Sequence, residues 1–299
     1  MVDYYGNELY TSKDWKDTAK FYDLFDSKRE IIDWMRSRPK AKPKIVHYNE
    51  ETDNYAVVVI PTIDTNSKWS KNAKHIFDKL HIVFAENRNK KPNPYFNYSK
   101  SVNEGVKAAL HYNPEWVIIS NDDMIKEDHI SKLITELKHS ENYDTVFFPK
   151  TNTYSSQNCL YKPRIQKLIR QMSYWRRAYA NILNRLNVKY ELLDGKDHGF
   201  VYKNLIYKKD KIKIKHHQGN LIILNTNYIR RILKGKVFDD TFINGHEDSM
   251  LSYKYLQNSN FKMSEFRISA IVGGSLGTDK SRWFREIANE IYFEYKTRV

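Results

Sequence analysis

The stretch WVIISNDDM, residues 116 to 124, joins an apolar, strand-like run to Asn121, Asp122 and Asp123. In open α/β sheets, ligands bind outside the carboxyl ends of the strands. Carboxylates at such an end suit a divalent cation that carries a phosphorylated substrate. The alternative is a solvated turn with a helix N-cap, because Asp and Asn also favour those positions. The neighbouring segments decide between these two interpretations.

Residues 55 to about 150 alternate strand and helix patterns. Short apolar runs predict strands, and longer amphipathic runs between them predict helices. Such an alternation predicts βαβ units, and hence an α/β fold with a mostly parallel central sheet flanked by helices. The expected strands are 56–60, 81–85, 116–120 and 145–149, and the expected helices are 98–112 and 126–139.

The pattern differs on either side of this region. Residues 1–52 are predicted to form a helical N-terminal extension that packs on the main domain, because apolar residues recur at helical spacing between 14 and 35 before Pro39 and Pro43. The main domain is expected to span 53–299. From residue 218, the sequence predicts a strand, a helix start near Asn225 or Thr226, a turn around Gly235 and a further amphipathic helix headed by Glu247 and Asp248.

Residues 151–217 read as a variable insertion. Segment 164–186 combines an apolar helical stripe with arginines, which fits a basic amphipathic helix in peripheral contact with a membrane or a helix packed on the domain with its basic face in water. Segment 203–215 alternates Lys with apolar residues and predicts an exposed hairpin or edge strand.

Composition narrows the class of protein. The 299 residues can bury a sizeable core. The single cysteine, Cys159, excludes an intramolecular disulfide and any cysteine-rich zinc site. No apolar run approaches a membrane span and the N-terminus is unlike a secretory signal, so we expect a cytoplasmic protein, with peripheral contact at the inner membrane face as a variant. The net charge of +14 favours polyanions or phosphorylated small molecules as partners, or reflects a lysine-rich proteome.

Taken in order, these segments resemble the family 2 glycosyltransferases, nucleotide-sugar-dependent enzymes with the Rossmann-like GT-A fold. The resemblance covers roughly residues 55–150, as a nucleotide-binding half, and 218–285, as an acceptor half. Each piece is weak alone, and their order carries the resemblance. The pieces are AVVVIPT (56–62), IVFAEN (82–87), NYSKSVNEGVKAA (97–109), IISNDDM (118–124), GNLIIL (219–224), KVFDDTF (236–242) and HEDSML (246–251).

The resemblance implies a donor site for a nucleotide diphosphate sugar, with UDP favoured. Asn121 and Asp123 match the Asp-x-Asp element in an Asn-x-Asp form, so Asp123 is the expected ligand of Mn²⁺ or Mg²⁺. Asn121 can hydrogen-bond the ribose or a phosphate oxygen, and Asp122 either joins the nucleotide site or caps a helix. The remaining expected nucleotide contacts are Pro61, Thr62, Glu86 at the base, and Asn103 with Gly105.

The resemblance also implies the chemistry. Asp248 is the expected general base that takes the proton of the acceptor hydroxyl, and Glu247 orients it or binds the acceptor. Family members invert the anomeric centre in a single in-line displacement. The expected acceptor is a glycan, a protein or a lipid-linked sugar.

The chain departs from the family pattern at two places. Val272 or Gly273 stands where many relatives have a histidine that helps to bind the metal or the diphosphate. Either metal affinity is weaker here, or another group such as His216, His217 or His246 substitutes for it. Val102 replaces an arginine that often precedes the signature asparagine. The loop after Gly274 holds residues that could close over the diphosphate or form an ordinary flexible glycine loop: Ser275, Thr278, Lys280 and Arg282.

Two other functions stay open. A basic nucleic-acid-binding protein would explain the charge and the 164–186 segment, although the chain has no zinc finger, ribonucleoprotein motif or recognition helix. A degenerate transferase that binds a nucleotide sugar without turning it over would explain the missing histidine.

Overall fold

The structure is a computed structural model and describes residues 4–87, 93–148, 158–161, 212–215, 217, 219–271 and 280–297. The predicted basic helix at 164–186, His216 and the glycine loop at 272–279 lie outside these residues. The chain divides into two compact units. The sheet unit comprises Lys40–Cys159 and Lys213–Gly277, and the helical unit comprises Met1–Pro39, Leu160–Ile212 and Thr278–Val299.

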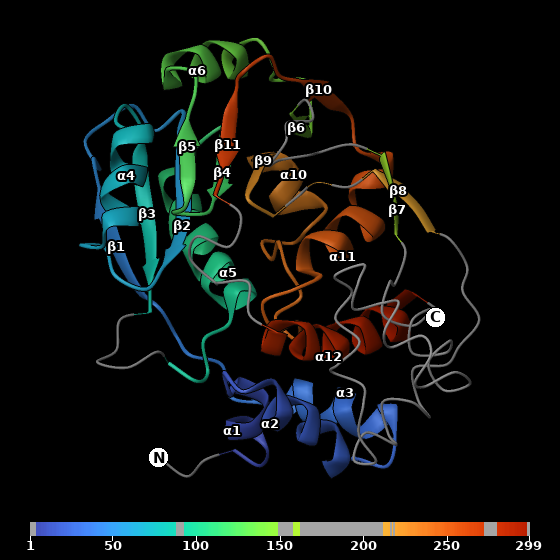
Figure 1. The fold of residues 1–299 in the computed structure, drawn as a ribbon. Helices are drawn as coiled ribbons and strands as arrows, with labels where there is room; N and C mark the ends of the chain where they lie inside the picture. Colours follow the sequence, from blue (N-terminus) through green and yellow to red (C-terminus); the bar gives the residue numbers. More distant parts are fainter. Residues whose placement is uncertain are drawn as a thin grey trace, which may run out of the picture. The chain divides into compact units, whose positions relative to one another are not determined.

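A central sheet organises the sheet unit (Figure 1). In the described part of the chain, five of its seven strands run in one direction, and β1 and β9 run in the opposite one. The prediction of a mixed α/β fold with a mostly parallel central sheet is therefore confirmed. In spatial order the strands are β1 (Lys44–Tyr48), β3 (His81–Glu86), β2 (Ala56–Thr62), β4 (Trp116–Ser120), β9 (Leu221–Asn225), β6 (Thr145–Phe147) and β10 (Phe261–Met263).

Helices cover both faces of this sheet because its central strands are apolar on both sides, as is typical of parallel sheets. Val58 and Ile60 of β2 belong to one core cluster, with residues of α4 (Lys68–Ile76) and α6 (Ile130–Lys138). Val57 and Val59 belong to the other cluster. That second cluster includes residues of α5 (Tyr98–Ala109), α10 (Thr226–Arg231), α11 (Glu247–Lys254) and η5 (Leu256–Asn258).

Smaller elements complete the sheet unit. β5 (Met124–Lys126) pairs antiparallel with β11 (Ile268–Ala270), and η2 (Leu110–Tyr112) follows α5. β7 (Asn158–Tyr161) and β8 (Ile212–Lys215) form a second two-stranded ladder. The strand expected within 203–215 is thus present at its end.

The helical unit is held together by aromatic packing. Its described helices are α1 (Asn7–Thr11), α2 (Trp15–Lys20), η1 (Phe21–Leu24), α3 (Lys28–Ser37) and α12 (Lys280–Thr297). The ring centroid of Phe21 lies 5.0 Å from that of Tyr10 and 4.6 Å from that of Trp34. The buried Tyr22 hydroxyl donates to the Phe284 carbonyl, which joins the N-terminal helices to α12.

The two units divide the chain differently from the expected boundary at residue 52. Residues 40–52 belong to the sheet unit, because β1 pairs antiparallel with β3. The C-terminal helix belongs to the helical unit rather than to the main domain. A second difference is local: the helix expected from Lys126 begins at Ile130, because β5 occupies Met124–Lys126 and His129 caps α6.

Candidate functional site

The first part of the site lies where β2 and β4 end. The two strands are parallel, and their last register pair joins Val59 to Ile119. Proline lacks the N–H that a longer ladder needs, and Pro61 follows two residues later. Past the ladder, the Thr62 hydroxyl donates to Asp122 Oδ2 at 2.8 Å.

Asp122 and Asp123 are buried, at 7% and 5% exposure. Burial raises the pKa of Asp122 to about 6; the hydrogen bond from Thr62 lowers it, and the charge of Asp123 raises it again. A carboxylate that is shielded from water and placed beside another carboxylate is stabilised by a cation. The two aspartates therefore fit the predicted divalent metal ion chemically.

Tyr98 connects this strand end to the second half of the chain. It is the first residue of α5, and its half-buried phenol donates to Asn121 Oδ1 at 3.0 Å and to the Gly219 carbonyl at 3.1 Å. The backbone N–H of Asn121 also donates to the Asn220 carbonyl at 2.9 Å. The residue after β4 is thus held against the segment that leads into β9.

The same segment holds Asp248. The Gly219 N–H donates to Asp248 Oδ2 at 2.9 Å, and the Ser249 N–H donates to Oδ1 at 2.7 Å. A side chain at position 219 would press on this carboxylate, because an added Cβ would lie 3.3 Å from Oδ2. Asp248, at the start of α11, is therefore oriented by one N–H group from the segment before β9 and one from its own helix. The buried Glu247 precedes it.

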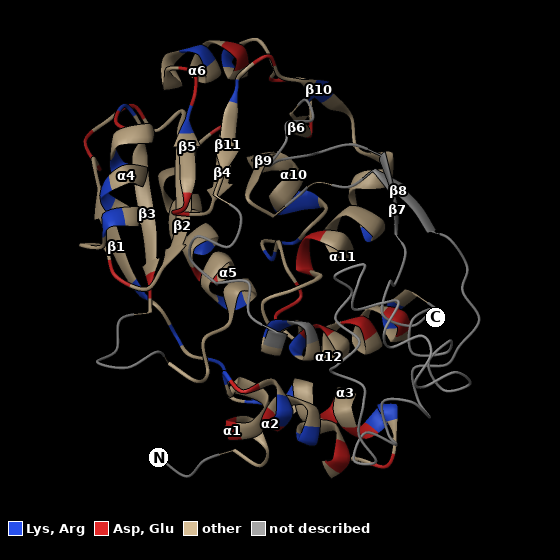
Figure 2. Cartoon of the chain, viewed as in Figure 1, with Lys and Arg blue, Asp and Glu red and all other residues tan. Residues whose placement is uncertain are grey.

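The two acidic pairs share one electrostatic environment. Burial raises the pKa of Tyr98 well above its usual value, and the charges of Glu247, Asp248, Asp123 and Asp122 raise it further, in that order. Charges more than 120 positions apart in the sequence thus act on one phenol. Figure 2 shows the acidic segments, in red, where β4 passes into β5 and at the start of α11.

Glu86 is the last residue of β3, and its carboxylate is hydrogen-bonded by Thr65. Its Oε1 accepts the backbone N–H and the hydroxyl of Thr65, each at 3.0 Å. The register pairs Glu86 with Thr62, so the residue expected to bind the base and a second residue expected beside the nucleotide are neighbours. Its contact with a base stays a prediction.

Asn103 has a structural contact. Its Nδ2 donates to the Phe238 carbonyl at 2.8 Å, and its Oδ1 accepts the Phe238 N–H at 3.0 Å. Both ends of the amide therefore hold α5 against the segment after α10, and Asn97 does the same by donating to the Phe242 carbonyl at 2.7 Å. The expected contact of Asn103 with the nucleotide stays a prediction, and it would have to be made alongside these bonds.

The candidate substitutes for the missing histidine differ in their surroundings. His217 is fully buried, its Nε2 lies 2.9 Å from the Val146 carbonyl, and its ring stacks on Phe147. These contacts are those of a core histidine. His246 precedes α11 with a left-handed backbone, φ 66°, directly beside Glu247, and its substitution for the missing histidine stays a prediction.

Sequence reasoning missed Tyr98. It is one of 22 tyrosines and stands inside a segment matched for its asparagine and glycine, so no local signal separates it from the others. Its role in the site depends on contacts with residues 121 and 219, which only the folded chain brings together.

Within the described ranges, no three His, Cys, Asp or Glu side chains are grouped so that they could hold a metal ion by themselves. None of the helices in that part of the chain is long and apolar enough to cross a membrane.

A scan against protein-family models finds no match, and a search of curated proteins also finds none. Among solved structures, the chain is similar to one titled "Crystal Structure of A197 from STIV", with a TM-score of 0.37 and 10% identity, covering 72% of this chain and 85% of that one. A likeness at this level does not identify a family.

Proposed function

We propose that this chain is a metal-dependent inverting glycosyltransferase of the GT-A type, similar to family 2. It would move a sugar from a nucleotide diphosphate sugar, with UDP as the favoured nucleotide, to a hydroxyl of a glycan, a protein or a lipid-linked sugar. One observation carries the proposal: the Tyr98 hydroxyl bonds Asn121, which precedes Asp122 and Asp123, and also Gly219, whose N–H bonds Asp248, so one phenol joins the segments that carry the two acidic pairs. A transferase needs such a pairing, because one group of carboxylates must serve the leaving diphosphate and another the attacking hydroxyl.

The donor side is supported by the strand ends. The strands β3, β2 and β4 are parallel, and Glu86, Thr62 and Asp122 lie at or just after their carboxyl ends. Open α/β folds bind ligands at these ends of the strands. Asp123 is the proposed metal ligand, with the remaining ligands supplied by diphosphate oxygens and water, as is usual for Mg²⁺. When bound, the cation would neutralise the charge that develops on the leaving diphosphate.

The acceptor side rests on the geometry of Asp248. Hydrogen bonds from Gly219 and Ser249 fix the direction of this carboxylate. A carboxylate held in one direction can accept the proton of an acceptor hydroxyl, and Glu247 would assist by binding or orienting that hydroxyl.

The same hydrogen bonds favour a second candidate function, a nucleotide-sugar-binding protein without turnover. A carboxylate that already accepts two backbone N–H groups is a weaker base. In that case Asp248 would serve only to position Gly219, and the donor site would remain.

Calorimetric titration of UDP, GDP and dTDP, each with and without Mn²⁺, tests the donor site. We expect UDP to bind only with Mn²⁺, and Asp123→Ala to weaken that binding by about tenfold or more, or roughly 1.4 kcal/mol. The control is Asp78→Ala, which removes an exposed carboxylate in the same unit and should leave binding unchanged. Absence of binding by all three nucleotides would rule out the proposal.

Release of UDP from a panel of UDP-sugars tests the catalytic role without knowledge of the acceptor. We expect Asp248→Asn to lower the release rate by about 10²- to 10⁴-fold while UDP still binds with Mn²⁺. Binding without release by the unaltered protein, with acceptor glycans present, would instead support the non-catalytic binding protein.

A further inference from the structure

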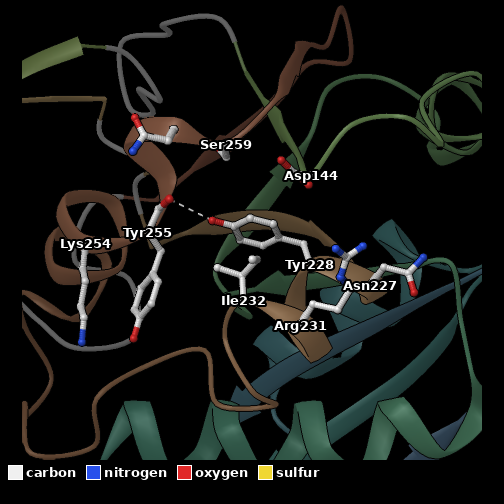
Figure 3. A pocket seen from close by; sticks show the side chains of 9 residues that line it. Asp144, Asn227, Tyr228, Arg231, Ile232, Lys254, Tyr255 and Ser259 are labelled. Atoms are coloured by element: carbon white, nitrogen blue, oxygen red, sulfur yellow. Dashed lines mark hydrogen bonds between the residues drawn. The ribbon is translucent and has the colours of Figure 1, made fainter.

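A cavity of about 380 Å³ lies at the opposite end of the central strands, near the start of β4 (Figure 3). Asp144, at its wall, precedes β6, and its carbonyl accepts the N–H of Asn225, which pairs with Trp116 at the start of β4. The candidate transferase site lies past the far end of β4. A five-residue strand rises about 16 Å, so the two sites are separate.

Hydrogen bonds hold two of the residues that line the cavity, Tyr228 and Asp144. Tyr228 is 6% exposed, and its hydroxyl donates to the Tyr255 carbonyl at 2.9 Å (Figure 3). Burial, followed by the charge of Asp144, raises the pKa of Tyr228 to about 12, so this phenol stays protonated and keeps its hydrogen bond. The Asn260 N–H likewise holds one oxygen of Asp144, at 2.8 Å.

The polar groups around these two residues are available to a ligand. Arg230 is held by Asn113 Oδ1 and the Leu110 carbonyl. In the described part of the chain, its neighbour Arg231 has no ion pair or hydrogen bond from its guanidinium, nor does the side-chain amide of Asn227 have a partner there. Lys254 lies 5.1 Å from the ring centroid of Tyr255 and, among the described residues, faces no carboxylate.

Figure 3 shows how these groups are arranged. Arg231 and Asp144 lie to one side of the Tyr228 ring, and Lys254 and Tyr255 lie to the other. The half-exposed Ile232 adds an aliphatic surface beside the ring. A ligand in this cavity would therefore meet a cation, a carboxylate, amide groups and a small apolar surface.

We propose that this cavity binds a small hydroxylated anion, of the class of sugar phosphates and sugar acids, with Arg231 on its anionic group. A guanidinium recognises a carboxylate or phosphate through two parallel hydrogen bonds. Asp144 disfavours a ligand made only of anionic groups, because like charges repel, but it accepts hydrogen bonds from hydroxyls. The volume lies near the lower end of the range for ligand sites, roughly 300–1,000 Å³, which suits a ligand of one or two rings.

The test uses glucuronate and glucose 6-phosphate as the two anionic probes, with glucose and inorganic phosphate for comparison. Binding to the full chain is followed by titration monitored by NMR at low salt. We expect at least one of the anionic sugars to bind more tightly than both comparison compounds. Whichever of the two binds better identifies the carboxylate or the phosphate as the preferred group.

Variants assign the binding to the cavity. Arg231→Gln, at an exposed position, should weaken binding by about tenfold, and Asn227→Ala should weaken it to a smaller degree. Lys71→Gln removes an equal charge from an exposed position on α4 and should have no effect, and Asp123→Ala should also have none. The last variant keeps this inference independent of the proposed transferase site.

Three results would overturn the inference. One is that neither anionic sugar binds the unaltered protein. Another is that Arg231→Gln binds as the unaltered protein does. The third is that inorganic phosphate or a short oligonucleotide binds through Arg231 more tightly than both sugars, which would assign the cavity to bare phosphate groups.

Discussion

Asp122 carries its charge in surroundings that disfavour it. The side chain is 7% exposed, lies next to Asp123 and accepts a hydrogen bond from Thr62. Because burial dominates, the pKa rises to about 6. Perturbed carboxylates of this kind concentrate at functional sites, and this one follows the strand that carries the Asn-x-Asp element.

Stability should therefore depend on pH through Asp122. Its pKa is higher in the folded state than the value of about 3.9 in an unfolded chain, so folding binds a proton between these values. The contribution of this group to stability falls as the pH rises from about 4 to about 6, and then stays low. Asp122→Asn removes the charge and should raise the free energy of unfolding at pH 7.5 by up to about 3 kcal/mol.

Urea unfolding of both proteins at pH 4 and pH 7.5 measures this effect. Asparagine can still accept the Thr62 hydroxyl, so that hydrogen bond is common to both proteins. The expectation fails if the difference in the free energy of unfolding between Asp122→Asn and the unaltered protein is the same at both pH values.

The Tyr98 hydroxyl joins the segment after β4 to the segment that leads into β9. Tyr98→Phe removes the bonds to Asn121 and Gly219, and Gly219 in turn orients Asp248. We expect a loss of about 1 kcal/mol in stability, UDP binding close to that of the unaltered protein, and a turnover rate at least about tenfold lower.

Tyr228→Phe is the matched control for this change. This substitution also removes a hydrogen bond from a phenol to a backbone carbonyl, at 2.9 Å, but in the cavity at the opposite end of the central strands. It should cost similar stability and leave turnover unchanged. Equal turnover in both variants would limit Tyr98 to a structural role.

Among the elements, α5 positions most of the site. Its first residue is Tyr98, and it packs on β2 and β3. Its N-cap Asn97 and its second-turn residue Asn103 hold the segment around residues 238–242. Gly105 permits this packing, because an added Cβ would lie 2.5 Å from Val59 Cγ1. The glycine that the family resemblance placed near the nucleotide is therefore explained by helix-to-sheet contact.

Gly105→Ala should destabilise the protein by about 1–3 kcal/mol through overpacking. The sign of this change in stability is informative, because a Gly to Ala substitution on an exposed helix face would stabilise the helix by up to about 1 kcal/mol. Val59→Ala makes room for the new methyl group, so the double variant should be more stable than the sum of the two single changes implies, by about 1 kcal/mol. Additive effects in denaturant unfolding would contradict the contact.

At the scale of the whole molecule, the two units have separate cores and the chain carries a net charge of +14. The blue segments of Figure 2 are distributed over several helices, including α3, α4, α6 and α12. A positive net charge attracts polyanions without sequence preference. Basic character alone thus does not distinguish a transferase from a nucleic-acid-binding protein.

Salt dependence separates these functions. We expect an oligonucleotide to bind with an affinity that falls steeply between about 50 and 200 mM salt, by up to about 10³-fold or more if many phosphates are contacted. Asp123→Ala should leave this binding intact while it weakens the binding of UDP with Mn²⁺ by about tenfold or more. Sequence-selective binding that persists at high salt would favour a nucleic-acid function.

Much of the fold followed from local pattern. Apolar runs bounded by polar residues correctly predicted β2, β3, β4 and β9, and the helical spacing of apolar residues predicted α5. These patterns are visible locally because a fully buried strand is apolar throughout and an amphipathic helix is apolar on one face. The acidic residues after β4 and at the start of α11 were also recognisable in the sequence. The resemblance supplied their proposed roles, which the structure leaves as proposals.

Long-range contacts decided the rest. β1, β5 and β11 are short, and each depends on a strand that is distant in sequence, so their local patterns are weak. The same is true of the assignment of α12 to the helical unit. By itself the sequence determined the layered α/β architecture and the carboxylates at its strand ends, since periodicity and turn chemistry are local. Only the tertiary structure brought Asn121, Gly219 and Asp248 together around Tyr98, because these hydrogen bonds join residues 23 to 121 positions apart and exist only once the sheet has formed.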